Sequence, residues 1–125
     1  MPHATILYAE DNLFLCQAVT ELLRDEGWSV EVCANGCAAM SRLACGARYD
    51  LLLLDDDLPG VTGIEIARYA RGLRPYARTP IVMLSAGDHH YEALRVGADE
   101  FLHKPDDVMR LVEVVGRLLA AHRAE

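Results

Sequence analysis

The sequence predicts an α/β protein in which a parallel β-sheet is covered by helices on both faces. The chain has 125 residues, 52% of them hydrophobic and 25% charged, which suits one soluble domain with its own core. Five short apolar runs recur along it, and helical patterns fill the gaps between them. Strand and helix alternating five times favour parallel strands, because each helix returns the chain to the same end of the sheet. We therefore expect a single domain over residues 1–125.

The expected strands are short and rich in residues that favour strands. They cover residues 6–9, 30–33, 51–54, 81–84 and 100–102. The first, third and fourth are apolar throughout, which is typical of parallel strands buried on both faces.

Apolar residues at helical spacing predict the helices. The stripes expected to face the core are Leu15, Val19, Leu22 and Leu23; Ala39, Met40 and Leu43; Ile66, Tyr69, Ala70 and Leu73; and Val108, Leu111, Val112, Val115, Leu118 and Leu119. The glycines expected to end helices are Gly27, Gly46 and Gly97. The residues expected to begin the last three helices are Thr62, in a capping box with Glu65, then Asp88 and Asp106.

Composition excludes several classes of protein. The net charge of −7 argues against binding to nucleic acid or anionic membranes. No apolar run approaches the ~20 residues needed to span a bilayer, and the start lacks the pattern of a signal peptide, so a cytoplasmic location is expected. The spacing of Cys16, Cys33, Cys37 and Cys45 matches no zinc motif, which favours reduced, structural cysteines.

Polar residues stand where the strands end. Glu10 and Asp11 follow the first strand, Asp55 the third, Ser85 the fourth and Lys104 the fifth. Parallel strands have their carboxyl ends at one edge of the sheet, where ligands of such folds bind. Three carboxylates, a hydroxyl and an ammonium are therefore expected to meet there.

This set of groups suits phosphoryl chemistry. Three close carboxylates would raise one another's pKa, whereas Mg²⁺ prefers oxygen ligands and would neutralise them and an incoming phosphate. A carboxylate can accept a phosphoryl group covalently. Lys104 could then pair with one phosphoryl oxygen while Ser85 donates a hydrogen bond to another.

Simpler interpretations exist for each piece. Glu10-Asp11-Asn12 could merely begin a helix, and Asp55-Asp56-Asp57 could be a solvated turn before Pro59-Gly60. Lys104-Pro105 could be a plain loop feature. None of these readings predicts that the groups fall together at the ends of successive strands.

The same segments resemble the receiver domains of bacterial two-component response regulators. The resemblance covers essentially the whole chain in order, and its segments are residues 6–12, 53–63, 80–86 and 97–105. It implies a flavodoxin-like (βα)5 doubly wound parallel sheet with strand order 2-1-3-4-5.

The resemblance also implies roles for individual residues. Glu10 and Asp11 would bind Mg²⁺, Asp55 would both ligate the metal and receive the phosphoryl group, and the backbone carbonyl of Asp57 would be a further ligand. In a second set, Ser85 and Lys104 would bind the phosphoryl group, Phe101 would be the aromatic switch residue that turns inward in the active state, and Lys104-Pro105 would be a cis peptide.

A sensor histidine kinase or a histidine phosphotransfer protein would be the donor, by the same resemblance. The face formed by the fourth helix, fifth strand and fifth helix would change on phosphorylation and meet a downstream partner or output domain that the sequence does not identify. A phosphorylation-dependent dimer is compatible with this. No enzymatic turnover is expected beyond self-phosphorylation and autodephosphorylation.

Two positions depart from the common pattern of the family. Asp57 places an extra carboxylate two residues after the acceptor, and Gly87 contributes no side chain two residues after Ser85. In the family these positions influence how long the phosphoryl group survives, so both are expected to tune its lifetime.

Two other functions were weighed. Asp55-x-Asp57 superficially matches the nucleophile motif of haloacid-dehalogenase phosphatases, but that motif normally follows the first strand of a longer chain. The other is a receiver-like binding module that is not phosphorylated, whose usual sign is loss of the acceptor, the acidic pair or the lysine. The acceptor, the acidic pair and the lysine are all present here. The chain is expected to be either a stand-alone receiver or one part of a larger regulator.

Overall fold

The computed structural model describes residues 4–123 and contains one five-stranded parallel sheet, in the order β2-β1-β3-β4-β5. The strands are β1 (Thr5–Ala9), β2 (Ser29–Cys33), β3 (Leu51–Asp55), β4 (Ile81–Ser85) and β5 (Glu100–His103). The helices are α1 (Leu13–Asp25), α2 (Gly36–Ala44), α3 (Gly63–Arg71), α4 (His90–Arg95) and α5 (Leu111–Arg123), with short 3-10 helices η1 (Arg74–Tyr76) and η2 (Val108–Arg110). The predicted strand order is confirmed, and each predicted strand lies within one residue of its observed bounds.

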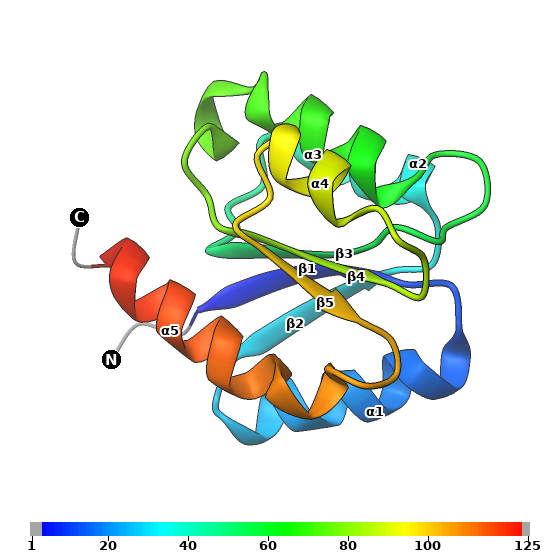
Figure 1. The fold of residues 1–125 in the computed structure, drawn as a ribbon. Helices are drawn as coiled ribbons and strands as arrows, with labels where there is room; N and C mark the ends of the chain where they lie inside the picture. The colour runs from blue at the N-terminus through cyan, green and yellow to red at the C-terminus, as the bar shows by residue number, and fades with distance from the viewer. Residues whose placement is uncertain (1–3, 124–125) are drawn as a thin grey trace.

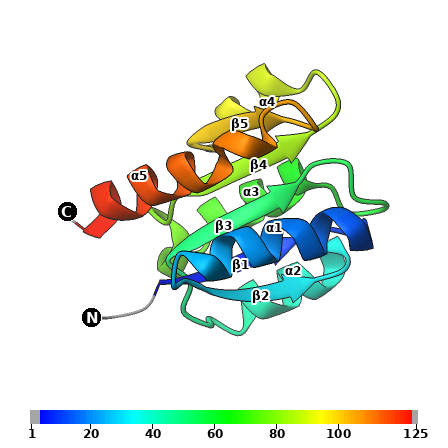
Figure 2. The same ribbon diagram turned by 90° about the horizontal axis from the view of Figure 1, so that it is seen from below.

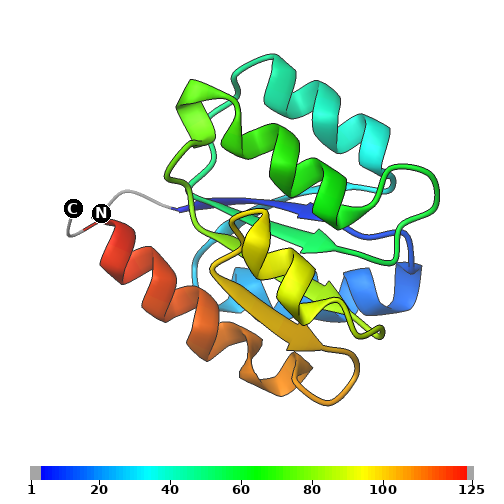
Figure 3. The same ribbon diagram turned by 45° about the horizontal axis from the view of Figure 1, so that its top comes forward.

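Helices cover both faces of the sheet. In Figure 1, α2, α3 and α4 lie on one side of the strands and α1 and α5 on the other. Figures 2 and 3 show these two helical layers in turn, and the twisted sheet between them. In β1, β3, β4 and β5, side chains of alternate residues enter one or the other of two hydrophobic clusters, which explains why the central strands are apolar throughout.

The strand order places the site. Strand β1 pairs with β2 on one side and β3 on the other, so the order reverses between β1 and β3. Residues that end or directly follow these two strands lie beside the reversal, where doubly wound sheets bind ligands. Of the sequence-predicted residues, Glu10, Asp11 and Asp55 occupy these positions.

Three predicted helix boundaries are wrong. Asp88 does not cap α4: His89 is the residue before the helix, and no side chain caps it. The last helix begins at Leu111 rather than near Asp106, because the Asp107 carboxylate accepts the backbone N–H of His103 (2.9 Å) and holds a turn that continues into η2. Helix α3 ends at Arg71, so Leu73 packs on the core from beyond it.

Other local predictions are confirmed. Thr62 and Glu65 form the capping box of α3, and the Lys104-Pro105 peptide is cis. Asn12 caps α1 by accepting the Leu15 N–H (3.1 Å), so the acidic pair also stands at the start of a helix. Among the cysteines, Cys33 is buried in the core, but Cys37 and Cys45 are exposed, so the expected structural role does not fit these two.

Helix α3 sits tightly against the end of β3. A Cβ added to Gly63, the first residue of α3, would lie 2.7 Å from the carbonyl oxygen of Asp55 and 2.7 Å from Sδ of Met83. Glycine is therefore required for this close approach, which fixes the loop that follows Asp55.

Arg71 ties the opposite edge of the sheet together. Its guanidinium donates to the backbone carbonyls of Tyr76 (2.8 Å), Thr79 (2.6 Å) and Gly97 (2.7 Å), and pairs with the carboxylate of Asp99. One side chain thus anchors the segments that precede β4 and β5. None of the helices within residues 4–123 is long and apolar enough to cross a membrane.

Candidate functional site

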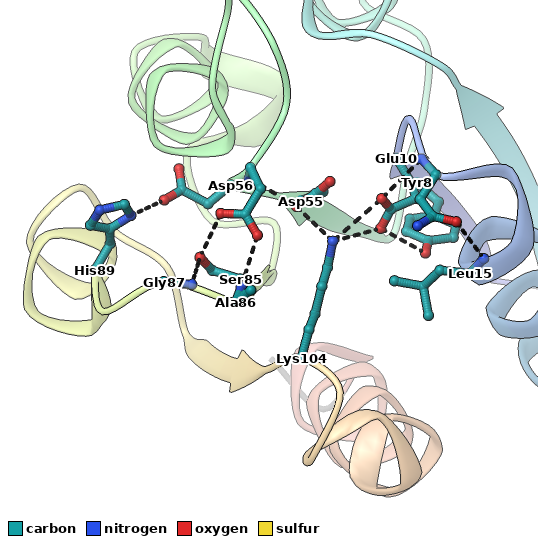
Figure 4. A network of polar contacts seen from close by, with 12 residues as sticks. Tyr8, Glu10, Leu15, Asp55, Asp56, Ser85, Ala86, Gly87, His89 and Lys104 are labelled. Carbon is teal, nitrogen blue, oxygen red and sulfur yellow. Dashed lines mark hydrogen bonds and ion pairs between the residues drawn. The ribbon is translucent and has the colours of Figure 1, made fainter.

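The polar residues at the strand ends form one connected network. Figure 4 shows the side chains of Glu10, Asp55, Ser85 and Lys104 arriving from four different strands or the loops after them. Carboxylate oxygens of Glu10, Asp11 and Asp55 lie within 4.8 Å of one another. Glu10 and Asp55 are buried, whereas Asp11 is exposed, so the acidic cluster opens to solvent on one side.

Lys104 bridges the two buried carboxylates. Its Nζ lies 2.9 Å from Oδ1 of Asp55 and 3.1 Å from Oε1 of Glu10. Burial by itself lowers the pKa of Lys104, but the adjacent carboxylates of Asp55 and Glu10 outweigh it, and the net pKa is raised. The lysine is therefore held as a cation at the place where a phosphoryl group on Asp55 would lie.

Asp55 keeps one oxygen without a partner. Its Oδ1 accepts the Lys104 ammonium and the backbone N–H of Asp57 (2.8 Å). Its Oδ2 is the one buried side-chain oxygen or nitrogen within residues 4–123 that has no hydrogen-bond partner. A buried carboxylate oxygen left unpaired is costly, and this atom is therefore available to a cation or another ligand.

Glu10 is crowded by negative charge. Burial, followed by the neighbouring Asp55 carboxylate, raises the pKa of Glu10 to about 7 although Lys104 opposes this rise. The Tyr8 hydroxyl (3.3 Å) and the Asn12 backbone N–H (3.3 Å) donate to its two oxygens. The charge of Lys104 alone thus does not neutralise the negative charge of the carboxylate cluster.

The donor set fits a hard divalent cation. Glu10, Asp11 and Asp55 offer carboxylate oxygens only, which suit Mg²⁺ better than softer metals. The unpartnered Oδ2 of Asp55 and the raised pKa of Glu10 both indicate a shortage of positive charge. The solvent-exposed side at Asp11 leaves room for the water ligands that Mg²⁺ retains.

The Asp57 side chain contacts the loop between β4 and α4. The Ser85 hydroxyl donates to its Oδ1 (3.0 Å), and the backbone N–H of Ala86 donates to its Oδ2 (2.8 Å). The Gly87 N–H in turn donates to Oγ of Ser85 (2.9 Å). Ser85 therefore lies at the site, as predicted, but its hydrogen bond goes to Asp57.

Asp56 was missed as a structural residue. It is buried, its Oδ1 accepts the Ile64 N–H (3.0 Å), and its Oδ2 lies 2.7 Å from Nδ1 of His89. The interpretation of the triplet as a solvated turn is wrong for this residue. No local pattern separates Asp56 from its acidic neighbours, since its partners stand 8 and 33 residues further along the chain.

Phe101 is buried on the same side of the sheet as α4. Its ring stacks on His90 with centroids 5.3 Å apart and meets His103 edge-on at 5.0 Å. The aromatic side chain is thus already buried while Ser85 is bonded to Asp57, and its role as a switch stays a prediction.

The structure is a doubly wound parallel sheet with a carboxylate cluster at its strand-order reversal and a lysine directly after its last strand. This arrangement is typical of α/β proteins that bind phosphoryl groups at the carboxyl ends of their strands. The sequence matches the family described as response regulator receiver domain over residues 6–116. The chain belongs to this family, whose members are phosphoacceptors in two-component signalling.

Curated relatives are transcriptional regulators. The chain is 34% identical over 117 residues to the transcriptional regulatory protein CutR of Streptomyces coelicolor, covering 90% of this chain and 53% of CutR. It is 36% identical over 121 residues to the DNA-binding response regulator MtrA of Mycobacterium tuberculosis, covering 94% of this chain and 50% of MtrA. The chain spans about half the length of the curated relatives it matches.

Solved structures of the same fold cover nearly the whole chain. The chemotaxis protein CheY4 of Vibrio cholerae superposes with a TM-score of 0.85 at 32% identity, covering 94% of this chain and 99% of that one. The receiver domain of the sensor histidine kinase PA1611 of Pseudomonas aeruginosa gives a TM-score of 0.84 at 30% identity, covering 95% and 99%. That structure has a magnesium ion coordinated in its active-site cleft.

Proposed function

We propose that this chain is a receiver domain over residues 1–125 that takes a phosphoryl group onto Asp55 from a phosphohistidine, in a reaction that depends on Mg²⁺. The observation that carries the proposal is the unpartnered, buried Oδ2 of Asp55 beside the ammonium of Lys104. Asp55 would supply the nucleophilic oxygen, and Lys104 would supply a cation for the incoming charge.

The Mg²⁺ site is proposed from the same residues. The carboxylates of Glu10, Asp11 and Asp55, with the backbone carbonyl of Asp57, would hold the ion. When bound, Mg²⁺ would neutralise charge on the phosphoryl oxygens. The ion coordinated in the PA1611 receiver domain supports this assignment.

The proposed transfer is a substitution at phosphorus. A bond forms between a carboxylate oxygen of Asp55 and phosphorus while the bond from phosphorus to the donor's histidine nitrogen breaks, and the donor imidazole leaves with that electron pair and takes up a proton. Lys104 would stabilise the charge on the transferred group. The phosphoryl group would later be lost to water, without turnover of an external substrate.

The proposed switch begins at Ser85. A phosphoryl group on Asp55 would attract its hydroxyl, which must first leave the Asp57 carboxylate. Movement of Ser85 would shift the β4–α4 loop and repack Phe101 on the face formed by α4, β5 and α5. Asp57 and Gly87 would tune how long the phosphoryl group survives, Asp57 through its charge and Gly87 through the absence of a side chain.

The partners are proposals as well. A sensor histidine kinase or a histidine phosphotransfer protein would supply the phosphoryl group in the cytoplasm. CutR and MtrA are about twice as long as this chain, which favours a further domain that carries the output. A separate partner or phosphorylation-dependent dimerisation are the alternatives. The net charge of −7 argues against contact with nucleic acid or membranes through this domain.

Incubation with acetyl phosphate, with and without Mg²⁺, tests the acceptor. Intact-mass analysis should show one phosphoryl adduct on the wild type with Mg²⁺, none on Asp55→Asn, and the wild-type adduct on Asp88→Asn, which removes an exposed carboxylate of the β4–α4 loop. An adduct of equal size on Asp55→Asn would place the acceptor elsewhere. No adduct on the wild type would favour a receiver-like module that is not phosphorylated.

Ser85→Ala tests the coupling. This variant should still be phosphorylated, but the amide resonances of α4 and β5 should respond to the phosphoryl group much less than in the wild type. An unchanged response would refute the role of Ser85 in transmission.

A further inference from the structure

The β4–α4 loop is held at both ends by the two carboxylates that follow Asp55. Asp57 accepts hydrogen bonds from Ser85 and Ala86 at the start of the loop, and Asp56 contacts His89 at its end. We propose that His89 and Asp56 form a proton-sensitive latch that holds this loop in its unphosphorylated position. The inference rests on the proposed function, because it concerns the loop that carries Ser85.

The two partners of the latch have very different surroundings. The side chain of Asp56 is 3% exposed, whereas that of His89 is 54% exposed. The Asp56 carboxylate also accepts a hydrogen bond from the Ile64 N–H at the start of α3. The contact between His89 and Asp56 therefore joins the loop to a rigid part of the fold. His89 can exchange protons with solvent, and Asp56 cannot move to follow it.

Gly87 lies between Ser85 and His89, the two groups of the loop that contact the aspartates. A Cβ added to Gly87 would lie 3.4 Å from Cε1 of His89 and 3.4 Å from Oγ of Ser85. The His89 imidazole and the Ser85 hydroxyl therefore both lie beside Gly87, and Ser85 is the residue that the switch must move. A Cβ at position 87 would fit in ordinary van der Waals contact with both groups.

The charges around His89 favour its protonated form. The hydrogen bond and charge of Asp56 raise the pKa of His89, and desolvation opposes this rise. Glu92 on α4 and Asp57 add smaller contributions that raise it. A loop that moves away from Asp56 returns His89 toward its ordinary pKa. Protonation thus stabilises the latched loop, and this stabilisation is lost as the pH rises through the pKa of the latched state.

Linkage makes the consequence measurable. Occupancy of the phosphoryl site requires Ser85, and hence the loop, to move. A ligand that favours the released loop should therefore bind more tightly at higher pH, by about tenfold for each unit by which release lowers the pKa of His89.

The first measurement tests the pair itself. Histidine resonances of the whole chain are followed by NMR between pH 5 and 9. The midpoint of His89 should fall in Asp56→Asn and be unchanged in Asp99→Asn, which removes a carboxylate at the opposite edge of the sheet. An unchanged midpoint in Asp56→Asn would refute the latch.

The second measurement tests coupling to the site. The probe is beryllofluoride with Mg²⁺, and its apparent affinity is measured across the same pH range in the wild type, His89→Asn and His122→Asn. Because fluoride chemistry and Glu10 also respond to pH, the quantity compared is the ratio of affinities between variant and wild type at each pH.

The outcomes separate the latch from the proposed function. His89→Asn should bind several-fold more tightly than the wild type at low pH, with the ratio falling toward one at high pH, while His122→Asn keeps a constant ratio. A ratio for His89→Asn that does not change with pH would refute the latch and leave the phosphoryl site intact. Absence of wild-type binding at every pH would instead overturn the proposed function, and the latch with it.

Discussion

Replacing Lys104 with methionine would remove the one cation that contacts Asp55 and Glu10 among residues 4–123, while keeping a side chain of similar length. The lysine lies 2.9 Å from Asp55 and 3.1 Å from Glu10, and both carboxylates are buried. In the variant two buried negative charges would face each other without a cation between them. We therefore expect Lys104→Met to destabilise the metal-free protein.

The size of the effect follows from the site. Breaking a buried ion pair by removing one partner costs about 3–5 kcal/mol when the other charge remains. Glu10 can relieve part of this cost, since its pKa is already raised to about 7 and loss of the lysine would raise it further. The free energy of unfolding should fall by about 3 kcal/mol at pH 8 and by roughly half as much at pH 6, where Glu10 carries a proton.

Urea unfolding at both pH values, in EDTA and in Mg²⁺, measures this difference. Mg²⁺ should stabilise the variant more than the wild type, because it binds the folded state and supplies the missing charge. Arg117→Met is the matched control: its pair with Glu100 is exposed (56% and 30%), so it should cost under about 1 kcal/mol at either pH. A loss for Lys104→Met as small as that of the control at pH 8, or one that does not shrink at pH 6, would refute the reasoning.

Three further predictions concern the metal and the scaffold. Mg²⁺ affinity should weaken by up to about tenfold per pH unit below about 7, because Glu10 must lose its proton to bind the ion. Calorimetry in buffers of different ionisation enthalpy would measure the proton that is released on binding. Glu10→Gln should abolish that release. Gly63→Ala should cost about 1–3 kcal/mol in urea unfolding, since its Cβ would meet the Asp55 carbonyl at 2.7 Å, and Gly72→Ala, with no contact under 3.5 Å, is its control. Arg71→Met should lower the free energy of unfolding by about 2–4 kcal/mol in the same measurement, because it removes the guanidinium that donates to three backbone carbonyls. A loss under about 1 kcal/mol would mean that water replaces the guanidinium.

The fold could be predicted from sequence because its signals are local and repeated. Three strands are continuous apolar runs, and the capping box at Thr62 and Glu65 announces a helix within four residues. The boundaries that failed depend on contacts across a turn: Asp107 binds the His103 N–H, which delays α5 until Leu111. A pattern of apolar residues at helical spacing does not reveal a hydrogen bond between a side chain and the backbone of a preceding turn.

The acidic centre of the site could be predicted for a related reason. Asp55 ends a strand, and Glu10 and Lys104 each directly follow one. A parallel sheet brings such strand ends together at one edge, whatever side chains they carry. The partners of Asp56 and Asp57 could not be predicted, because they depend on side-chain direction and on where the β4–α4 loop runs. The carboxylate of Asp57 accepts hydrogen bonds from Ser85 and Ala86, and its expected effect on the lifetime of the phosphoryl group stays a prediction.

The three consecutive aspartates divide the site between them because successive residues leaving a strand point in different directions. Asp55 faces Lys104, Asp56 faces His89, and Asp57 holds Ser85. If Asp55 is phosphorylated as proposed, the added negative charge acts twice on the same loop. It attracts the Ser85 hydroxyl and, by like-charge repulsion, weakens the position of the Asp57 carboxylate that retains it. Loss of one hydrogen bond and gain of another then depend on a single charge, so release of the loop needs no separate input beyond the phosphoryl group and the protonation state of His89.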